Sequence, residues 1–250
     1  MTRAIRLEVR KLRRLRQLPV LLALIVAVAA LSSVSLFSSA AQQDFDNPAA
    51  LPWESLLMSY TMMAAMTSPI LTAVLASRQT DIEHAASGWI LAGTAGFTPG
   101  TLVRAKQAML SILVAAGVAL QTAMVVGMGF ALGIQVPFDP GPWLGYTALL
   151  ALINAALLAL HTMLAATLEN QLVGVGIGMF GAFIGVFSLL IPPAITRFIP
   201  WGYYAMISQV TYTDRALVRI TPPYAWIAGF LVLVGVLFAL ATRRFDRIEG

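Results

Sequence analysis

The sequence predicts an all-α, polytopic membrane protein with one transmembrane domain, residues 1–250, built on six membrane-spanning helices. Its composition is the first observation behind this prediction, because 59% of the residues are hydrophobic and only 11% are charged, against about 25% charged in soluble domains. The second is a series of apolar segments, each near the roughly 20 residues needed to cross a bilayer. The sequence contains no cysteine, which excludes disulfides, thiol nucleophiles and cysteine metal sites.

Residues 2–16 are predicted to form an N-terminal amphipathic helix on the membrane surface. Seven basic residues alternate there with apolar residues at helical spacing. These are Arg3, Arg6, Arg10, Lys11, Arg13, Arg14 and Arg16. A basic start before an apolar segment also fits a signal peptide. The amphipathic pattern favours a retained helix, because a signal peptide would need only charge.

Six spans are expected after this helix, and they place both ends of the chain on one side. They are residues 18–37, 55–75, 105–132, 143–168, 172–190 and 224–241. With the ends in the cytoplasm, thirteen of the sixteen lysines and arginines fall inside, as the positive-inside rule requires. Arg197, Arg215 and Arg219 then remain outside. The net charge of +5 could suggest binding to nucleic acid, but the basic residues cluster beside apolar spans, where they orient the protein in the membrane. Nucleic acid is therefore not expected as a partner.

A charged cytoplasmic region, residues 78–104, separates the second and third spans. Thr80 as N-cap and Glu83 three residues later form a capping box, which predicts that a helix begins at Thr80. An apolar stripe follows at helical spacing, made of Ile82, Ala85, Ala86, Trp89 and Ile90. Asp81, Glu83 and His84 lie on the remaining circumference. We therefore expect a short amphipathic helix with one face toward membrane or a partner and the other toward water.

The segment before the last span, residues 192–223, is expected outside the cell. It is rich in proline and in aromatic residues such as Phe198 and Trp201. Prolines break helices, and aromatic side chains favour the headgroup depth of a membrane. A re-entrant or interface-lying pair of short helices is predicted, with a plain ordered cap over the spans as the alternative.

The fifth span carries two successive G-x-x-x-G units on one helix face. The glycines are Gly174, Gly178, Gly181 and Gly185. Small residues allow helices to approach closely in lipid. Either a neighbouring span or a second protomer is expected to pack there.

No motif in the chain indicates catalysis or metal binding by the chain itself. H-E-x-x-H and P-loop motifs are absent, and neither His84 nor His161 has a second histidine nearby. His161 shares a helix face with Asn154, a pairing that favours interhelical hydrogen bonding over catalysis. Because the predicted spans hold no buried acid or lysine, an ion-driven transporter is disfavoured. An energy source outside this chain is expected.

The whole layout resembles the permeases of ATP-binding-cassette (ABC) exporters, and it is most similar to their lantibiotic-immunity and bacitracin-type group. The specific letters are Asp81-Ile-Glu-His84, Trp89 and Lys106 between the second and third spans. The chain departs from that group after the tryptophan, where it has Leu91-Ala-Gly-Thr-Ala-Gly-Phe-Thr-Pro99.

The resemblance implies that the charged region is a coupling helix, which docks on a separate ATPase subunit and is buttressed by the N-terminal helix. Its contacts would be Thr80, Asp81, Ile82, Glu83, His84 and Trp89, flanked by the charges of Arg78, Arg104 and Lys106. The glycine face of the fifth span would lie at the contact between two protomers or line the path of the substrate. ATP and Mg would bind the partner, leaving no cofactor here.

A second permease half, identical or homologous, is implied as well, in the plasma membrane of a prokaryote. The substrate would be amphiphilic, such as an antimicrobial peptide, a lipid or a drug. A role in antibiotic resistance or immunity is implied by the first of these. Two alternatives stay open. One is a self-sufficient carrier or channel, and the other is an intramembrane hydrolase, using His161, or a scaffold.

Overall fold

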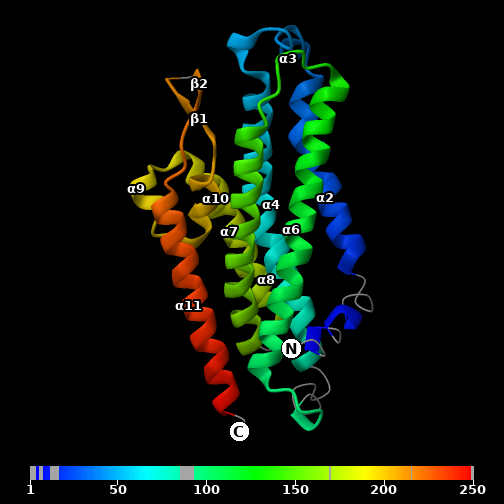
Figure 1. Cartoon of the computed structure of the whole chain (residues 1–250), viewed down its shortest axis with the longest axis vertical. Coiled ribbons are helices and arrows are strands. Elements are labelled where there is room, and N and C mark those ends of the chain that lie inside the picture. Colours follow the sequence, from blue (N-terminus) through cyan, green and yellow to red (C-terminus); the bar gives the residue numbers. More distant parts are fainter. Residues whose placement is uncertain are drawn as a thin grey trace.

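The computed structural model describes residues 4–5, 8–11, 17–84, 93–168, 170–214 and 216–248, and it shows an elongated bundle of long helices (Figure 1). The long helices are α2 (Gln17–Ser33), α4 (Pro52–His84), α6 (Pro99–Leu132), α7 (Pro140–Thr167), α8 (Gln171–Phe187) and α11 (Tyr224–Ile248). Each overlaps one of six segments that are long and apolar enough to cross a membrane. The predicted all-α, six-span class is therefore confirmed.

The two ends of the bundle differ in what they carry. Both ends of the chain lie at the lower end in Figure 1, which we call the terminus end. The opposite end, the hairpin end, carries the β-hairpin and a group of short helices after α2. These short helices are η1 (Val34–Phe37), α3 (Ser39–Gln43) and η2 (Pro48–Ala50).

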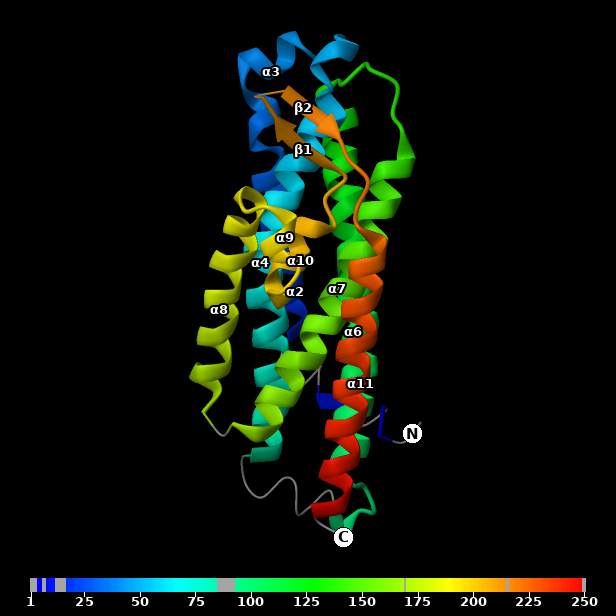
Figure 2. The ribbon, with the colours of Figure 1, turned by 90° about the vertical axis from the view of Figure 1, so that its left-hand side faces the viewer.

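Helix α4 lies at the centre of the packing. It contacts α2, α6, α7 and α8, while α6 also packs against α2, α7 and α11. Helices α8 and α11 stand on opposite sides of the bundle in the second view (Figure 2). They are the least covered spans, with 33% and 22% of their most apolar stretches buried. Their outer faces are therefore left to lipid or to another protein.

The predicted helix start at Thr80 is wrong. Helix α4 runs without a break from Pro52 to His84, so Thr80 lies inside a helix. A serine or threonine caps a helix only where the chain enters it from a non-helical conformation, and no glycine or proline separates Leu75 from His84. The second span therefore continues directly into the charged region. Residues 85–90, including Trp89, lie outside the described residues, as does the side chain of Ile82.

The segment before α11 contains short helices, as predicted, and also a hairpin that was not predicted. After η4 (Ser188–Leu190) come α9 (Pro193–Thr196), η5 (Pro200–Gly202) and α10 (Tyr203–Met206). Strands β1 (Val210–Thr213) and β2 (Ala216–Arg219) then pair antiparallel, with Val210 opposite Arg219. The sequence Val-Thr-Tyr-Thr, rich in β-branched residues, was the available signal for a strand. Asp214 follows it with a φ of 50°, which is typical of a turn.

Candidate functional site

A buried ion cluster joins three elements at the terminus end. Lys106, near the start of α6, is fully buried. Its Nζ donates hydrogen bonds to Glu8 Oε2 at 2.8 Å and to Glu83 Oε1 at 3.2 Å. It also donates to the backbone oxygen of Gln79 at 2.6 Å. One ammonium group therefore connects the N-terminal segment, the last turns of α4 and the start of α6.

A second lysine completes the cluster, which we define as Glu8, Lys11, Glu83 and Lys106. Lys11 Nζ donates to Glu8 Oε1 at 2.8 Å and also to Glu83. Gln79 Nε2 adds a hydrogen bond to Glu8 Oε2 at 2.9 Å. The two positive and two negative charges balance, so the cluster can be buried without an unpaired charge.

The pKa shifts of Glu8 and Lys11 favour their ionised forms. Burial alone would raise the pKa of Glu8, but the charges and hydrogen bonds of Lys106 and Lys11 outweigh burial and lower this pKa below 4.5. Burial would likewise lower the pKa of Lys11, and Glu8 and Glu83 raise it above 10.5. Removing one member of such a cluster leaves another charge buried and uncompensated, so the cluster fixes one arrangement of the three elements.

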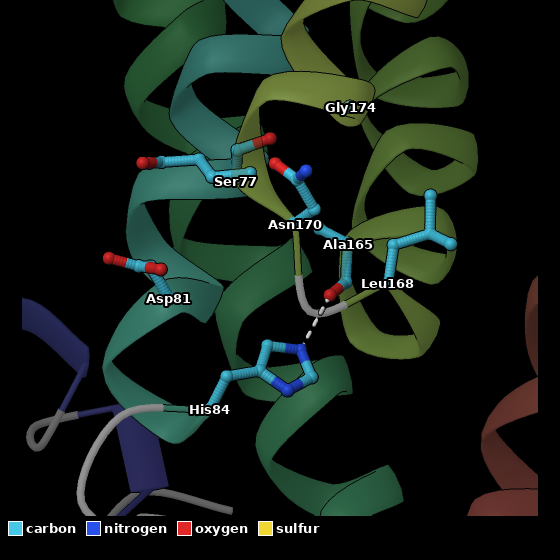
Figure 3. Close-up of a pocket in the computed structure, with 8 residues that line it drawn as sticks. Ser77, Asp81, His84, Ala165, Leu168, Asn170 and Gly174 are labelled. Carbon is cyan, nitrogen blue, oxygen red and sulfur yellow. Dashed lines mark hydrogen bonds between the residues drawn. The ribbon is translucent and has the colours of Figure 1, made fainter.

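The last residue of α4 ties the same end to α7. His84 Nε2 donates a hydrogen bond to the backbone oxygen of Ala165 at 2.8 Å, as the close-up shows (Figure 3). The crevice around this contact lies between the end of α4 and the turn from α7 to α8, and has a volume of about 10 Å³. That is about the space of one water molecule. Asp81 lines its rim and is exposed. The crevice is therefore a packed joint between helices.

The tail of α11 is attached to the same end. Arg104 in α6 donates to Asp246 Oδ2 at 3.0 Å. Gly100 makes this approach possible, because a Cβ at this position would collide with the backbone oxygen of Thr242 and the carboxylate of Asp246. We use the name terminus junction for these three contacts together, which are the ion cluster, the His84–Ala165 hydrogen bond and the Arg104–Asp246 pair. It links the N-terminal segment, α4, α6, α7 and α11.

Several predicted coupling residues are more buried than the sequence predicted. Glu83 was expected to face water and is 2% exposed, and Lys106 was expected to be a flanking charge and is fully buried. The prediction that the spans hold no buried acid or lysine is therefore wrong, because Lys106 lies within a candidate span. Thr80 is buried, and its hydroxyl has no hydrogen-bond partner among the described residues. Arg78 is half-buried.

Sequence reasoning missed Glu8, a member of the ion cluster, and Gln79, whose side chain hydrogen-bonds to Glu8. One signal was available for the first of them. Glu8 is the single acidic residue in the basic N-terminal segment, and it lies three residues before Lys11. An acid on the apolar side of a basic amphipathic helix indicates a buried cationic partner.

The glycine face of α8 is occupied by this chain itself. A Cβ at Gly174 would lie 2.8 Å from Ser77 Oγ, and one at Gly178 would lie 2.9 Å from the backbone oxygen of Pro69, both in α4. At Gly185 the nearest atom is the backbone oxygen of Ala65, also in α4, and at Gly181 it is the ring of Trp201. The prediction of a protomer seam or path wall is corrected, because these glycines give α4 and Trp201 their close approach.

Asn154 and His161 are both buried in α7, as their shared face predicted. Asn154 Oδ1 accepts a hydrogen bond from the Tyr204 hydroxyl at 2.8 Å, so it serves in packing between elements. His161 lies beside the Trp201 ring, with 6.4 Å between ring centres. Within the described ranges, no three histidine, aspartate or glutamate residues are grouped closely enough to hold a metal ion.

Comparison with known proteins gives one match. A family model described as ABC-2 family transporter protein matches residues 4–185, which include helices α2 to α7, nearly all of α8 and most of the terminus junction. No curated protein and no solved structure matches the chain significantly.

Proposed function

Because the chain belongs to the ABC-2 family of transporter proteins, we propose that it is the permease subunit of an ATP-driven exporter whose ATPase is a separate chain. The family is a membrane component of ABC transporters and supports association with an ATPase in general. The sequence contains no P-loop motif, which supports hydrolysis of ATP and binding of Mg on the partner.

The terminus junction is the observation that carries this proposal. Force applied to residues 78–104 acts on the end of α4, and that end is attached to α6 by Lys106 and to α7 by His84. Because charged and hydrogen-bonded contacts at low exposure resist separation, the joined helices would move together. A push from an ATPase would thus tilt several spans at once.

The role of each predicted coupling residue follows from its position in this proposal. Asp81 is exposed at the rim of the junction and, with Arg78 and Trp89, would face the ATPase. Glu83, Lys106 and Glu8 would act inside the permease by holding the coupling region to the spans. Thr80 and Ile82 would support this region from within α4.

The membrane orientation and the second half belong to the same proposal. The terminus end would face the cytoplasm of a prokaryotic cell, since most lysines and arginines flank it. A second permease half, identical or homologous, would complete the path. The exposed apolar faces of α8 and α11 support a lateral partner in the membrane, because they carry large side chains such as Phe180 and Val232.

The substrate class is proposed from the resemblance to lantibiotic-immunity and bacitracin-type exporters. It would be an amphiphilic molecule, such as an antimicrobial peptide, a lipid or a drug, moved outward from the membrane or cell. Apolar spans lining the path suit such a molecule.

The test is the subunit composition of the tagged chain, extracted gently from its own host. We expect a soluble P-loop subunit to copurify and to hydrolyse ATP. Asp81→Arg should reduce its recovery, whereas Asp46→Arg, an exposed acid at the hairpin end, should leave recovery unchanged. A stable monomer without ATPase activity would contradict the proposal.

A self-sufficient carrier or channel is the second candidate, and the buried ionisable groups around Lys106 favour it. Ionisable groups within spans often mark ion pathways. The purified chain in liposomes without ATP separates the two candidates. Solute movement under these conditions supports the carrier, and its absence supports the permease.

A further inference from the structure

A second cavity lies far from the terminus junction, between the α9–α10 segment and the first turns of α11. Its volume is about 360 Å³, which is within the range of roughly 300–1,000 Å³ for small-molecule sites. Its walls are almost entirely aromatic and apolar, except for one charged side chain, Arg197.

Arg197 is held in place by aromatic rings. Its guanidinium carbon lies 4.6 Å from the ring centre of Trp226 and 5.1 Å from that of Phe198. Cation–π contacts of this kind orient arginine while leaving its N–H groups able to donate. The Tyr203 hydroxyl donates to the backbone oxygen of Arg197 at 3.0 Å, which fixes the base of the side chain.

The charge of Arg197 is not neutralised within the described part of the chain. The described arginines in ion pairs are Arg104 and Arg219. Arg197 Nε is buried and has no hydrogen-bond partner among the described residues. Arg197 also lines the cavity, so an anion there could accept hydrogen bonds from the other nitrogens of its guanidinium.

Another part of the cavity wall is formed by aromatic rings. Tyr203 and Phe230 stack with their ring centres 4.0 Å apart. Gly229 lies beside them, and a Cβ at this position would meet no heavy atom within 4 Å. The absence of a side chain at Gly229 therefore leaves part of the cavity open.

The position of the cavity relative to the spans identifies the source of the ligand. The last span is Tyr224–Arg247, so Trp226 and Arg197 lie at the end of a membrane-crossing helix. Figure 1 shows α9 and α10 at the height where α11 begins. Tryptophan and arginine at this depth meet lipid headgroups.

We propose that this cavity binds the headgroup phosphate of an anionic membrane phospholipid, with Arg197 as the anion ligand and Tyr203, Trp226 and Phe230 against its glycerol and acyl groups. Guanidinium binds phosphate through two N–H groups at once. The aromatic walls match the apolar part of an amphiphile. A free phosphate ion has no apolar group for these walls to contact. The proposal rests on membrane insertion alone and is independent of transport.

Native mass spectrometry of the purified full chain in detergent tests this site. The probes are phosphatidylglycerol, diacylglycerol with the same acyl chains, and soluble glycerol phosphate. The first carries phosphate and chains, and the others lack one of the two. We expect one phosphatidylglycerol per chain to be retained in preference to either of the others.

Three variants locate the binding. Arg197→Gln should lower retention of phosphatidylglycerol about tenfold, the effect of losing one charged hydrogen-bond partner. Gly229→Leu should fill the cavity and lower retention with Arg197 intact. Gly235→Leu is the matched control, because Gly235 is also open on α11 but lies outside the cavity, and it should behave as the unmodified chain.

Each outcome decides the proposal. If Arg197→Gln does not fold, the pair of glycine variants still decides. Equal retention of phosphatidylglycerol by Gly229→Leu and Gly235→Leu would mean an adventitious lipid only. Retention of diacylglycerol as strong as that of phosphatidylglycerol would remove the role of the phosphate. Tight binding of glycerol phosphate alone would replace the lipid by a soluble anion.

Discussion

The two ends of the bundle are held together by different physics. At the terminus end, charges from positions as distant as Glu8 and Lys106 meet in one buried cluster. At the hairpin end, aromatic rings pack against one another. Trp53 lies 4.8 Å from Phe130 and from Phe138, centre to centre, and its Nε1 donates to the backbone oxygen of Val136 at 2.9 Å.

The difference determines how each end responds to change. A charge cluster at low exposure is sensitive to the loss of one member, because the remaining charges stay buried. Aromatic packing loses only the contacts and space of the residue removed. The terminus end therefore depends on the ionisation of its cluster, whereas the aromatic contacts around Trp53 do not titrate.

The largest expected effect is that of Lys106→Met. It leaves Glu8 and Glu83 buried with only Lys11 between them, so we expect a loss of about 4 kcal/mol in stability. Thermal unfolding in detergent measures it, with exposed Arg243→Met as control. Adding Glu8→Gln to Lys106→Met restores one charge of each sign and should recover part of the loss. A double variant no more stable than the single one would break the ion-cluster explanation.

The hairpin end is tested by Trp53→Ala. Trp53 is 3% exposed and contacts three aromatic rings, so its truncation should cost about 3 kcal/mol. The same unfolding measurement applies, and the loss should be equal at low and high salt. Trp53→Phe keeps one ring, loses the hydrogen bond to Val136 and part of the ring packing, and should cost less than Trp53→Ala. A salt-dependent loss in either variant would contradict a purely aromatic scaffold.

Low pH should affect the two ends of the same molecule differently. The pKa of Glu8 is lowered, so the stability that Glu8 contributes is complete above 4.5 and is lost as pH falls through the lowered value. Lys11 has a raised pKa, so its contribution is lost only as pH rises above 10.5. Hydrogen exchange below pH 4.5 should increase at the end of α4 before it increases around Trp53. Glu8→Gln should remove this acid-dependent step, and simultaneous opening of both ends would refute it.

The sequence was sufficient for the spans because their signal is local. Length and continuous apolar character define a membrane-crossing segment without reference to any other segment. The last span, expected at 224–241, falls within the apolar helical segment Tyr224–Arg247, for example. The face shared by Asn154 and His161 was likewise readable from helical spacing alone.

The contacts of the candidate site were not readable in this way. Lys106 pairs with Glu8 because the N-terminal segment docks on α4, and no local pattern encodes that docking. Thr80 and Glu83 have the letters of a capping box, but nothing near them makes the chain leave the helix. The glycines of α8 were correctly identified as a packing face, and the choice between α4 and a second protomer required the structure.

The smallest expected effect comes from the exposed one of the two ion pairs that Arg219 makes at the hairpin end. Arg219 on β2 donates hydrogen bonds to Glu54 and to Asp139, the latter at 2.8 Å, while its side chain is 51% exposed. The pair between Arg219 and Asp139 is exposed on both sides, so solvent screens it and Asp139→Asn should cost at most about 1 kcal/mol. The unfolding temperature should shift slightly, and the shift should shrink in high salt. A loss as large as that of Lys106→Met would mean that charge holds both ends, and the contrast between them would fail.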